Sequence, residues 1–243
     1  EGVQADVNIR GSTFEQNTVL IDGIKINDPQ TGHYTMDLPL TGFDMDRVEI
    51  LKGPASSLYG ANSFGGVINL LTKPVEDKKF IINAVGGQRD YFLGGASLSY
   101  PLDILKNRFS MDWSRAKPYI PNTEFDIIGL SEKSTLDTDF GNYDFLFGYT
   151  YKNFGAASFY SSANPNEAET TDTRFFKIGG VIEDHGLKVE PKFYLRRHYD
   201  KFELDKNMPG FGTNYHTNYT YGADIGFIIE NRFMDVAYGF ELA

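Results

Sequence analysis

The sequence predicts a mixed α/β domain in residues 1–74, a linker in 75–79 and antiparallel transmembrane β-barrel strands in 80–243. In the first part, short apolar runs are closed by Gly, Pro or Asp, which are turn signals, and Asp22-Gly23 predicts a hairpin. After the charged linker, apolar and polar residues alternate repeatedly. Alternation with a period of two is typical of strands that have one apolar face.

Composition narrows the classes of function. The chain has 15 Tyr, 20 Phe and 25 Gly, a mixture that favours strands and tight turns. It has no Cys, which excludes disulfides and thiolate metal sites. Its formal net charge of −10, without a basic patch, would repel a phosphate backbone, so we expect no nucleic-acid partner.

Hydropathy is compatible with a membrane only through strands. No stretch reaches the roughly 18 consecutive apolar residues of a spanning helix. Barrel strands expose only alternate residues to lipid, so the mean hydropathy of −0.35 does not exclude them. Residues 1–4 have neither the basic start nor the apolar core of a signal peptide, and we expect a mature chain or a fragment.

The alternation is clearest in residues 108–117, where Phe109, Met111 and Trp113 would share one face and polar residues the other. About nine such segments follow one another, each near the roughly 9 to 11 residues that cross a membrane at a tilt. An odd number leaves a barrel with open edges. We therefore expect an incomplete barrel. Its expected partners are the remainder of the barrel, in the same or a separate chain, and outer-membrane lipid.

The connections between these segments alternate in length, as in outer-membrane barrels, where short turns face the periplasm and long loops face outward. The first outer connection, at Arg89–Asp90, is expected to be tight. A soluble β-sandwich with one wet face is the alternative that alternation alone leaves open. The predicted short connections are 152–153, 183–186 and 230–232, and the predicted long ones are 118–136, 161–172 and 199–216.

Four ordered blocks in residues 5–74 resemble the plug domain of TonB-dependent receptors, most nearly the cobalamin-receptor type. The blocks are Val7-Asn8-Ile9-Arg10-Gly11, Val19-Leu20-Ile21-Asp22-Gly23, residues 47–54 (RVEILKGP) and residues 57–72 (SLYGANSFGGVINLLT). The resemblance implies that residues 1–74 are the C-terminal part of a plug and that the strands belong to a 22-stranded barrel. The strand half matches the family only in pattern.

The same resemblance implies a function. It is the import of a scarce, bulky nutrient, such as cobalamin, a ferric siderophore or haem, driven by the TonB complex of the inner membrane through a segment outside this chain. A surface lipoprotein is a further partner of this kind of receptor. The alternative is a passive porin or an adhesion barrel, which has no reason to carry a folded plug.

Two groups of residues are candidates for function. Arg10 and Glu49 are flanked by Val, Ile and Leu, and such charges are costly to bury unpaired. The resemblance implies that this arginine and this glutamate form an electrostatic lock with carboxylates of the barrel wall, so Arg10 and Glu49, with Arg47 and Lys52, are predicted to tether the plug to the barrel. A solvated surface pair is the alternative. The polar stretch 27–37 is predicted to be an apical loop that meets the ligand, as the plug apex does in the resembled family, and an ordinary loop is the alternative. The candidate ligand-binding residues are His33, Tyr34, Thr35, Ser56, Ser57, Tyr59 and Asn62.

Chemistry beyond binding is not supported. No nucleophile elbow, phosphate loop or zinc-ligand spacing is present, so we predict no catalytic residue, no metal site and no resident cofactor. His33 and Tyr34, with His198 or His216 in an outer loop, have the residue types that ligate haem iron, although a surface histidine is the simpler interpretation.

Overall fold

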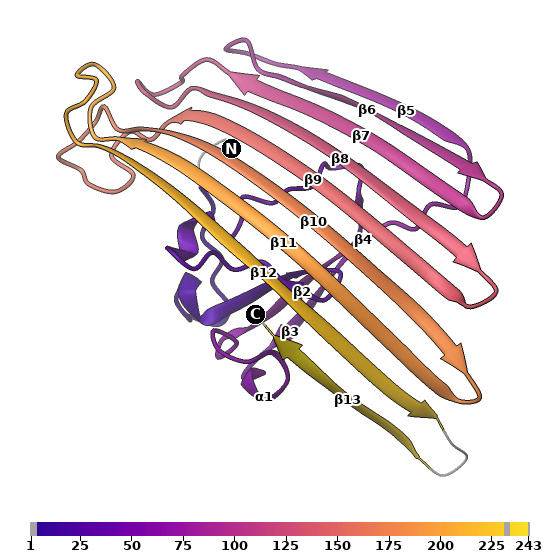
Figure 1. The fold of residues 1–243 in the computed structure, drawn as a ribbon. Coiled ribbons are helices and arrows are strands. Elements are labelled where there is room, and N and C mark those ends of the chain that lie inside the picture. Colours follow the sequence, from indigo (N-terminus) through magenta and orange to yellow (C-terminus); the bar gives the residue numbers. More distant parts are fainter. Residues whose placement is uncertain (1–3, 231–233, 243) are drawn as a thin grey trace.

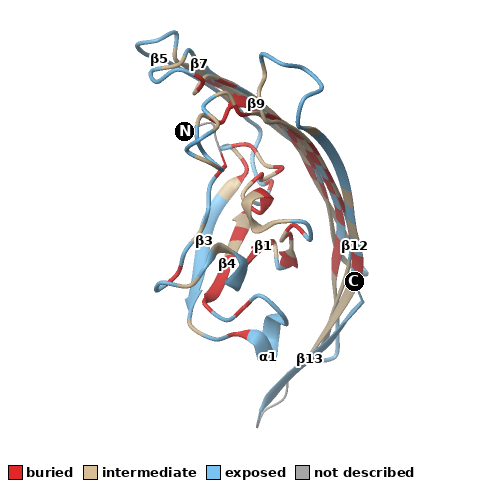
Figure 2. Cartoon of the chain, turned by 90° about the vertical axis from the view of Figure 1, so that its left-hand side faces the viewer, coloured by how far each residue is buried: buried red, intermediate tan, exposed pale blue. Residues whose placement is uncertain are grey.

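The computed structural model describes residues 4–230 and 234–242, which form two sheets (Figure 1). A four-stranded sheet of order β2-β1-β4-β3 makes the N-terminal domain. A nine-stranded antiparallel sheet, β5 to β13 in sequence order, makes a curved wall. Figure 2 shows the N-terminal domain on the concave side of that wall.

The N-terminal domain is a small mixed sheet. Strand β1 pairs in parallel with β4 and antiparallel with β2, and β3 pairs antiparallel with β4. Asp22 and Gly23, both with positive φ, turn β1 into β2, which confirms the predicted hairpin. The elements are η1 (Phe14–Gln16), β1 (Asn17–Ile21), β2 (Ile24–Lys25), η2 (Gly32–Tyr34), β3 (Met45–Lys52), α1 (Ser56–Tyr59) and β4 (Gly66–Thr72).

The wall begins at Lys79, after a segment without regular structure that follows Thr72. Its strands run from 11 residues in β6 to 18 in β12, apart from β5 and β13 with 8 each, so most are longer than the predicted 9 to 11. The strands are β5 (Lys79–Gly86), β6 (Phe92–Leu102), β7 (Leu105–Ala116), β8 (Phe125–Thr138), β9 (Gly141–Gly155), β10 (Ala168–Asp184), β11 (Leu187–Glu203), β12 (Thr213–Glu230) and β13 (Asp235–Leu242).

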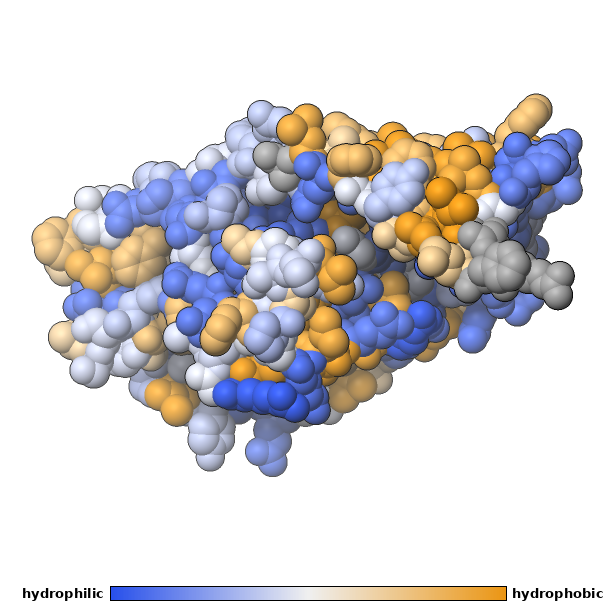
Figure 3. Space-filling view, turned by 90° about the horizontal axis from the view of Figure 1, so that it is seen from below, coloured by the Kyte–Doolittle hydropathy of each residue, from blue (hydrophilic) through white to orange (hydrophobic). Residues whose placement is uncertain are grey.

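The predicted alternation is confirmed in the wall. On β7, Phe109 and Met111 are exposed on the convex face, while Ser110 between them is buried against the N-terminal domain. On β11, Phe193 and Leu195 are likewise exposed. Seen from below, hydrophobic side chains gather at the β12–β13 end of the wall (Figure 3). An apolar outer face is what a strand needs in order to meet lipid.

The alternation of short and long connections is also confirmed, but several predicted positions were wrong. Lys152–Asn153 lies inside β9, and the short turn before that strand is at residues 139–140. The predicted loop 118–136 is shorter in the structure, residues 117–124, because β8 already begins at Phe125. The other long connections are residues 156–167 and 204–212, and the predicted short connection 183–186 is a turn at residues 185–186. The predicted short connection 230–232 lies largely outside the described residues. The inner strands extend beyond their alternating cores because their backbone groups pair with both neighbours.

The hydrophobic core joins the two sheets. Val19, Ile21 and Leu70 of the N-terminal domain pack in one cluster with wall residues that include Leu146 and Phe175. These two side chains project from the wall strands β9 and β10, and both are almost completely buried. The N-terminal domain is therefore packed on the wall as part of one core. No helix in the described part of the chain has the length and apolar character to span a bilayer.

Candidate functional site

The predicted ligand residues fall into two groups that face different surroundings. Tyr34 and Thr35 are buried, and the Tyr34 hydroxyl donates to Glu169 Oε1 of β10 at 2.5 Å. The ring of His33 stacks on Phe14 at 4.3 Å, and its Nδ1 lies 2.8 Å from Asp6. These residues fix η2 to the wall and to the rest of the domain, and only His33 keeps partial exposure.

The second group lies on the helical turn α1 and the residues after it. Ser56, Ser57, Tyr59 and Asn62 are exposed. Asn62 has a φ of 69°, a left-handed conformation that asparagine tolerates well, and its side chain has no partner among the described residues. Asn62 is the member of this group that reaches the loop containing η2.

A polar hollow of about 310 Å³ forms where the two groups meet. The loop that leads into η2 supplies most of its lining, η1 supplies the rest of one side, and Asn62 closes another. From β12 of the wall, Asn218 Nδ2 donates to Gln30 Oε1 at 2.7 Å. The hollow is lined by Glu15, Gln16, Asn27, Asp28, Pro29, Gln30, Thr31, Gly32, Thr35 and Asn62.

The hollow lies near the end of the wall that carries the long connections. The His33 ring, next to the lining residue Gly32, is 5.9 Å from the rings of Phe159 and Tyr160. Both belong to the β9–β10 connection, residues 156–167. In Figure 1 the indigo residues of this region lie on the side of the N-terminal domain nearer the long connections.

Four buried or nearly buried aspartates dock the N-terminal domain on wall cations. Asp28 binds Arg196 at 2.6 Å and Asp37 binds Lys152 at 2.5 Å. Asp22 lies 3.4 Å from Lys177 and 3.9 Å from Lys133, and Asp44 lies 3.4 Å from Arg108. The five cations come from five consecutive strands, one from each of β7 to β11. The domain contributes the negative charges and the wall the positive ones.

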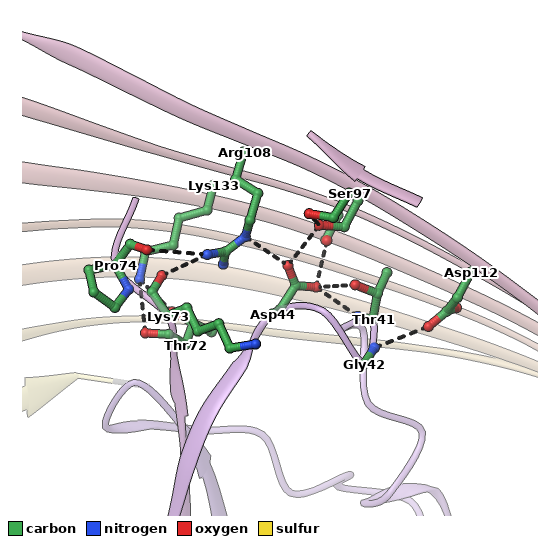
Figure 4. Close-up of polar contacts among 12 residues, drawn as sticks. Thr41, Gly42, Asp44, Thr72, Lys73, Pro74, Ser97, Arg108, Asp112 and Lys133 are labelled. Atoms are coloured by element: carbon green, nitrogen blue, oxygen red, sulfur yellow. Dashed lines mark hydrogen bonds and ion pairs between the residues drawn. The ribbon is translucent and has the colours of Figure 1, made fainter. Parts of the chain in front are cut away.

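Asp44 is the centre of the most extensive of these contacts (Figure 4). Its carboxylate accepts from Ser131 Oγ at 2.5 Å and from the backbone and hydroxyl of Thr41 at 2.8 Å each. Its own carbonyl accepts from Lys73 N at 2.7 Å, and Arg108 donates back to the Lys73 carbonyl at 3.0 Å. The loop before β3 and the exit of the domain after β4 are thus tied to the same place on the wall.

Wall glycines allow the loop before β3 to approach the wall closely. A Cβ at Gly148 would lie 1.8 Å from the carbonyl oxygen of Pro39, and one at Gly95 would lie 2.8 Å from the ring of Phe43. Between them, Gly42 N donates to Asp112 at 3.1 Å. Any side chain at Gly148 would push this loop off the wall. Glycine is needed at this position because the backbone of Pro39 approaches it too closely for a Cβ atom.

The docking contacts set the protonation of the domain's own groups. Burial raises the pKa of Asp22, but Lys177, Lys133 and hydrogen bonds from Thr72 lower it more, so the pKa lies below its usual value. Burial likewise raises the pKa of Asp37, but Lys152 and His198 lower it more, so this pKa also lies below its usual value. Burial and the neighbouring Glu169 raise the pKa of Tyr34, which therefore stays a neutral donor.

The predicted lock residues do not touch this wall. Arg47 is largely exposed and pairs with Asp46 and Glu49, its neighbours on β3. Arg10 and Lys52 are exposed and form no ion pair within residues 4–230 and 234–242. Strand β3 is an edge of its sheet, is exposed along almost its whole length, and lies on the side of the N-terminal domain away from the wall (Figure 2). The lock stays a prediction that concerns strands other than β5 to β13.

The histidines do not converge. His198 is fully buried on β11 with Nδ1 2.8 Å from Thr173 Oγ1, and His216 on β12 has Nδ1 2.9 Å from Asp200. Both lie in strands, so their expected place in outer loops was wrong. No group of three His, Asp or Glu side chains in the described residues has the arrangement of a metal site.

Sequence analysis missed the four docking aspartates and their wall partners. One signal was available: Arg108, Lys133, Lys177 and Arg196 stand at the polar positions of alternating strands, where the face opposite the lipid lies. Inward cations on neighbouring strands predict an acidic surface opposite. The aspartates themselves stand in turns and loops, where Asp is common for local reasons.

Comparison with known proteins agrees with this architecture. The family model of the TonB-dependent receptor plug domain matches residues 1–67. The vitamin B12 transporter BtuB of Photobacterium profundum is 33% identical over 98 residues, 39% of this chain and 16% of that protein. The metal-pseudopaline receptor CntO of Pseudomonas aeruginosa (strain UCBPP-PA14) is 47% identical over 60 residues, 24% of this chain and 8% of that protein.

Solved structures share the fold of both sheets. The unliganded ferric citrate transporter FecA gives a TM-score of 0.80 at 15% identity and covers 98% of this chain and 40% of its own. The siderophore receptor PiuA of Acinetobacter baumannii gives 0.73 at 16% identity, covering 99% and 40%. This chain thus spans less than half the length of either receptor. The relatives are receptors and transporters, which are not enzymes. Residues 1–67 are thus a plug domain of the TonB-dependent receptor type, and the whole chain has the fold of these receptors, which are outer-membrane proteins of Gram-negative bacteria.

Proposed function

We propose that this protein imports a scarce, bulky nutrient across the outer membrane, with the N-terminal domain as a gate that the inner-membrane TonB complex opens. The observation that carries the proposal is the docking of that domain on the concave side of the wall. A shared hydrophobic core and four ionic contacts hold it there. A pore that leaked freely would gain nothing from such a domain.

The wall is proposed to be the first part of a closed barrel of 22 strands. The described edge strands β5 and β13 each have only one neighbour in the sheet. Unpaired backbone groups are not tolerated in lipid, so further strands of the same or a separate chain must pair with both. Barrels of this size have a lumen wide enough to require a plug.

The lock of the sequence analysis belongs to this proposal. Arg10, Arg47, Glu49 and Lys52 lie on the part of the N-terminal domain that strands β5 to β13 leave uncovered. We propose that the remaining barrel strands cover this part and supply charged partners. The outer-membrane lipid would surround the barrel, and a surface lipoprotein is a further proposed partner.

The polar hollow is the proposed ligand site. It combines the predicted loop 27–37 with Asn62 and lies near the long connections, where a ligand from outside arrives. Its volume is at the lower end of ligand pockets, so it would hold one part of a bulky ligand while outer loops hold the rest. Tyr34, Ser56, Ser57 and Tyr59 would act around it. Cobalamin, ferric siderophores and haem are the candidate nutrients.

The test compares the full-length receptor with a variant that lacks residues 1–74, both reconstituted in planar bilayers. We expect no steady conductance from the intact receptor and large pores from the variant. Uptake of the nutrient by cells should stop when the proton gradient of the inner membrane is collapsed. Steady conductance of the intact receptor, or uptake without that gradient, would favour the passive porin instead.

A further inference from the structure

The polar hollow is lined by groups of one chemical kind. Its side chains are amides and hydroxyls, with two carboxylates and no lysine, arginine or histidine. One of the carboxylates, Asp28, is already neutralised by Arg196 at 2.6 Å. Glu15 is exposed and has no ion-pair partner among the described residues. The hollow therefore offers hydrogen bonds and, if anything, a weak negative charge.

Several of these groups are available to a ligand. Gln16 uses its Oε1 for Thr13 N, and Gln30 uses its Oε1 for Asn218, which leaves both Nε2 amides without a partner in the described chain. The whole Asn62 amide is in the same state. In contrast, the Asn27 amide already has two partners on the backbone of β1: its Oδ1 accepts from Val19 N and its Nδ2 donates to the Asn17 carbonyl. Three amide groups thus converge on the hollow with free donors.

The surrounding loops add no positive charge. Residues 156–167, which lie nearest, contain no lysine, arginine or histidine and one carboxylate side chain, that of Glu167. The lysines of two other long connections are already paired, Lys117 with Asp90 and Lys206 with Glu124. An anionic ligand entering here would lose its hydration and meet carboxylates and amides, with no cation to compensate.

We infer that the hollow takes an uncharged part of the nutrient that is rich in amide or hydroxyl groups, and that it discriminates against anionic metal chelates. This inference rests on the proposed function, since it names the ligand class of the same site. The free amide N–H groups can donate to carbonyl or hydroxyl oxygens of a neutral ligand. An anion could accept from them too, but it would face the carboxylates of Glu15 and Asp28 with no lysine or arginine in the lining. The remaining loops would add affinity, but the part of the ligand that enters the hollow would have to be uncharged.

The test uses the full-length receptor in detergent and two probes, vitamin B12, which carries peripheral amides, and ferric citrate, which is anionic. We expect vitamin B12 to bind, with an affinity that changes less than twofold between low and high salt. Asn62→Gly keeps the left-handed backbone and removes the amide, and Gln30→Ala removes another. Each should weaken binding about three- to tenfold, the loss of one or two hydrogen bonds.

A charge variant separates the ligand classes. Glu15→Lys replaces a carboxylate of the lining by a cation and should let ferric citrate bind, whereas the matched control Glu15→Gln should not. Binding of ferric citrate by the wild type that Asn62→Gly weakens and salt abolishes would overturn the inference, and so would binding of neither probe. Those outcomes are distinct from failure of the proposed function, which would appear as steady conductance of the intact receptor, whatever the hollow binds.

Discussion

The two sides of the N-terminal domain differ in how they treat charge. Toward the wall, Asp28 and Asp44 are almost completely buried, and each meets an arginine from a different strand. On β3, Arg47 and Glu49 are more than half exposed and pair with each other. Buried pairs are costly to break and exposed pairs are worth little. Docking on this wall therefore depends on the aspartates in loops and turns, and the charges on β3 contribute nothing to it.

The largest expected effect comes from breaking the most buried pair. Arg196→Met leaves the Asp28 carboxylate without its cation and should weaken docking by about 3 to 5 kcal/mol. Arg174→Met is the matched control, because Arg174 pairs with Asp172 but is mostly exposed. The measurement is the rate at which protease cleaves the N-terminal domain of the full-length receptor.

A double variant tests whether charge is the cause. Adding Asp28→Asn to Arg196→Met removes the unpaired carboxylate and should restore part of the protection, since two neutral groups are cheaper to bury than one charge. Cleavage of Arg196→Met at the wild-type rate would show that this pair does not hold the domain.

The next effect concerns backbone contact. Gly148→Ala places a Cβ 1.8 Å from the Pro39 carbonyl oxygen, so the loop before β3 must move off the wall. We expect a loss of about 1 to 3 kcal/mol, the usual cost of overpacking. Gly86→Ala, on β5 with nothing within 4 Å, is the control and should be neutral. Equal thermal unfolding of the two variants in detergent would mean that the loop is not held against β9.

Acid should weaken the same interface. The pKa of Asp22 is lowered in the folded state, so its contribution to docking is fully present above the ordinary carboxyl pKa and is lost as pH falls through the lowered value. The pKa of Asp37 is lowered too and acts in the same direction. Protease protection should therefore fall only below about pH 4. Asp22→Asn should flatten part of this dependence, and an unchanged pH profile would assign it to other groups.

The sequence predicted the faces of the wall better than its contacts. Alternation is a local property of the strand backbone, so the exposed Phe109 and the buried Ser110 could be predicted from their spacing. Turn positions such as 152–153 could not, because a strand end depends on pairing with both neighbours. Asp22 was correctly predicted to lie in a hairpin, yet its carboxylate also lies 3.4 Å from Lys177, 155 positions away in the chain. The same limit applies to the ligand site, where Asn62 joins the predicted loop only through the fold.

The smallest expected effect on this wall comes from Arg10 and the charges of β3, and it tests whether the side of the domain that β5 to β13 leave uncovered has a partner of its own. Arg10→Ala and Glu49→Ala break no contact with strands β5 to β13, so any effect on the full-length receptor must come from other barrel strands. If those strands supply charges, the N-terminal domain should loosen, with faster cleavage and easier leakage of small solutes. Asp46→Ala, on the same strand, is the control for a change confined to the surface pair. Unchanged protection and conductance in both variants would contradict the lock and leave the docked aspartates as the sole ionic anchor. Loosening in either variant would mean that the two sides of the domain are held by different patterns of charge. The side toward β7 to β11 is acidic, and the side toward the rest of the barrel is mixed.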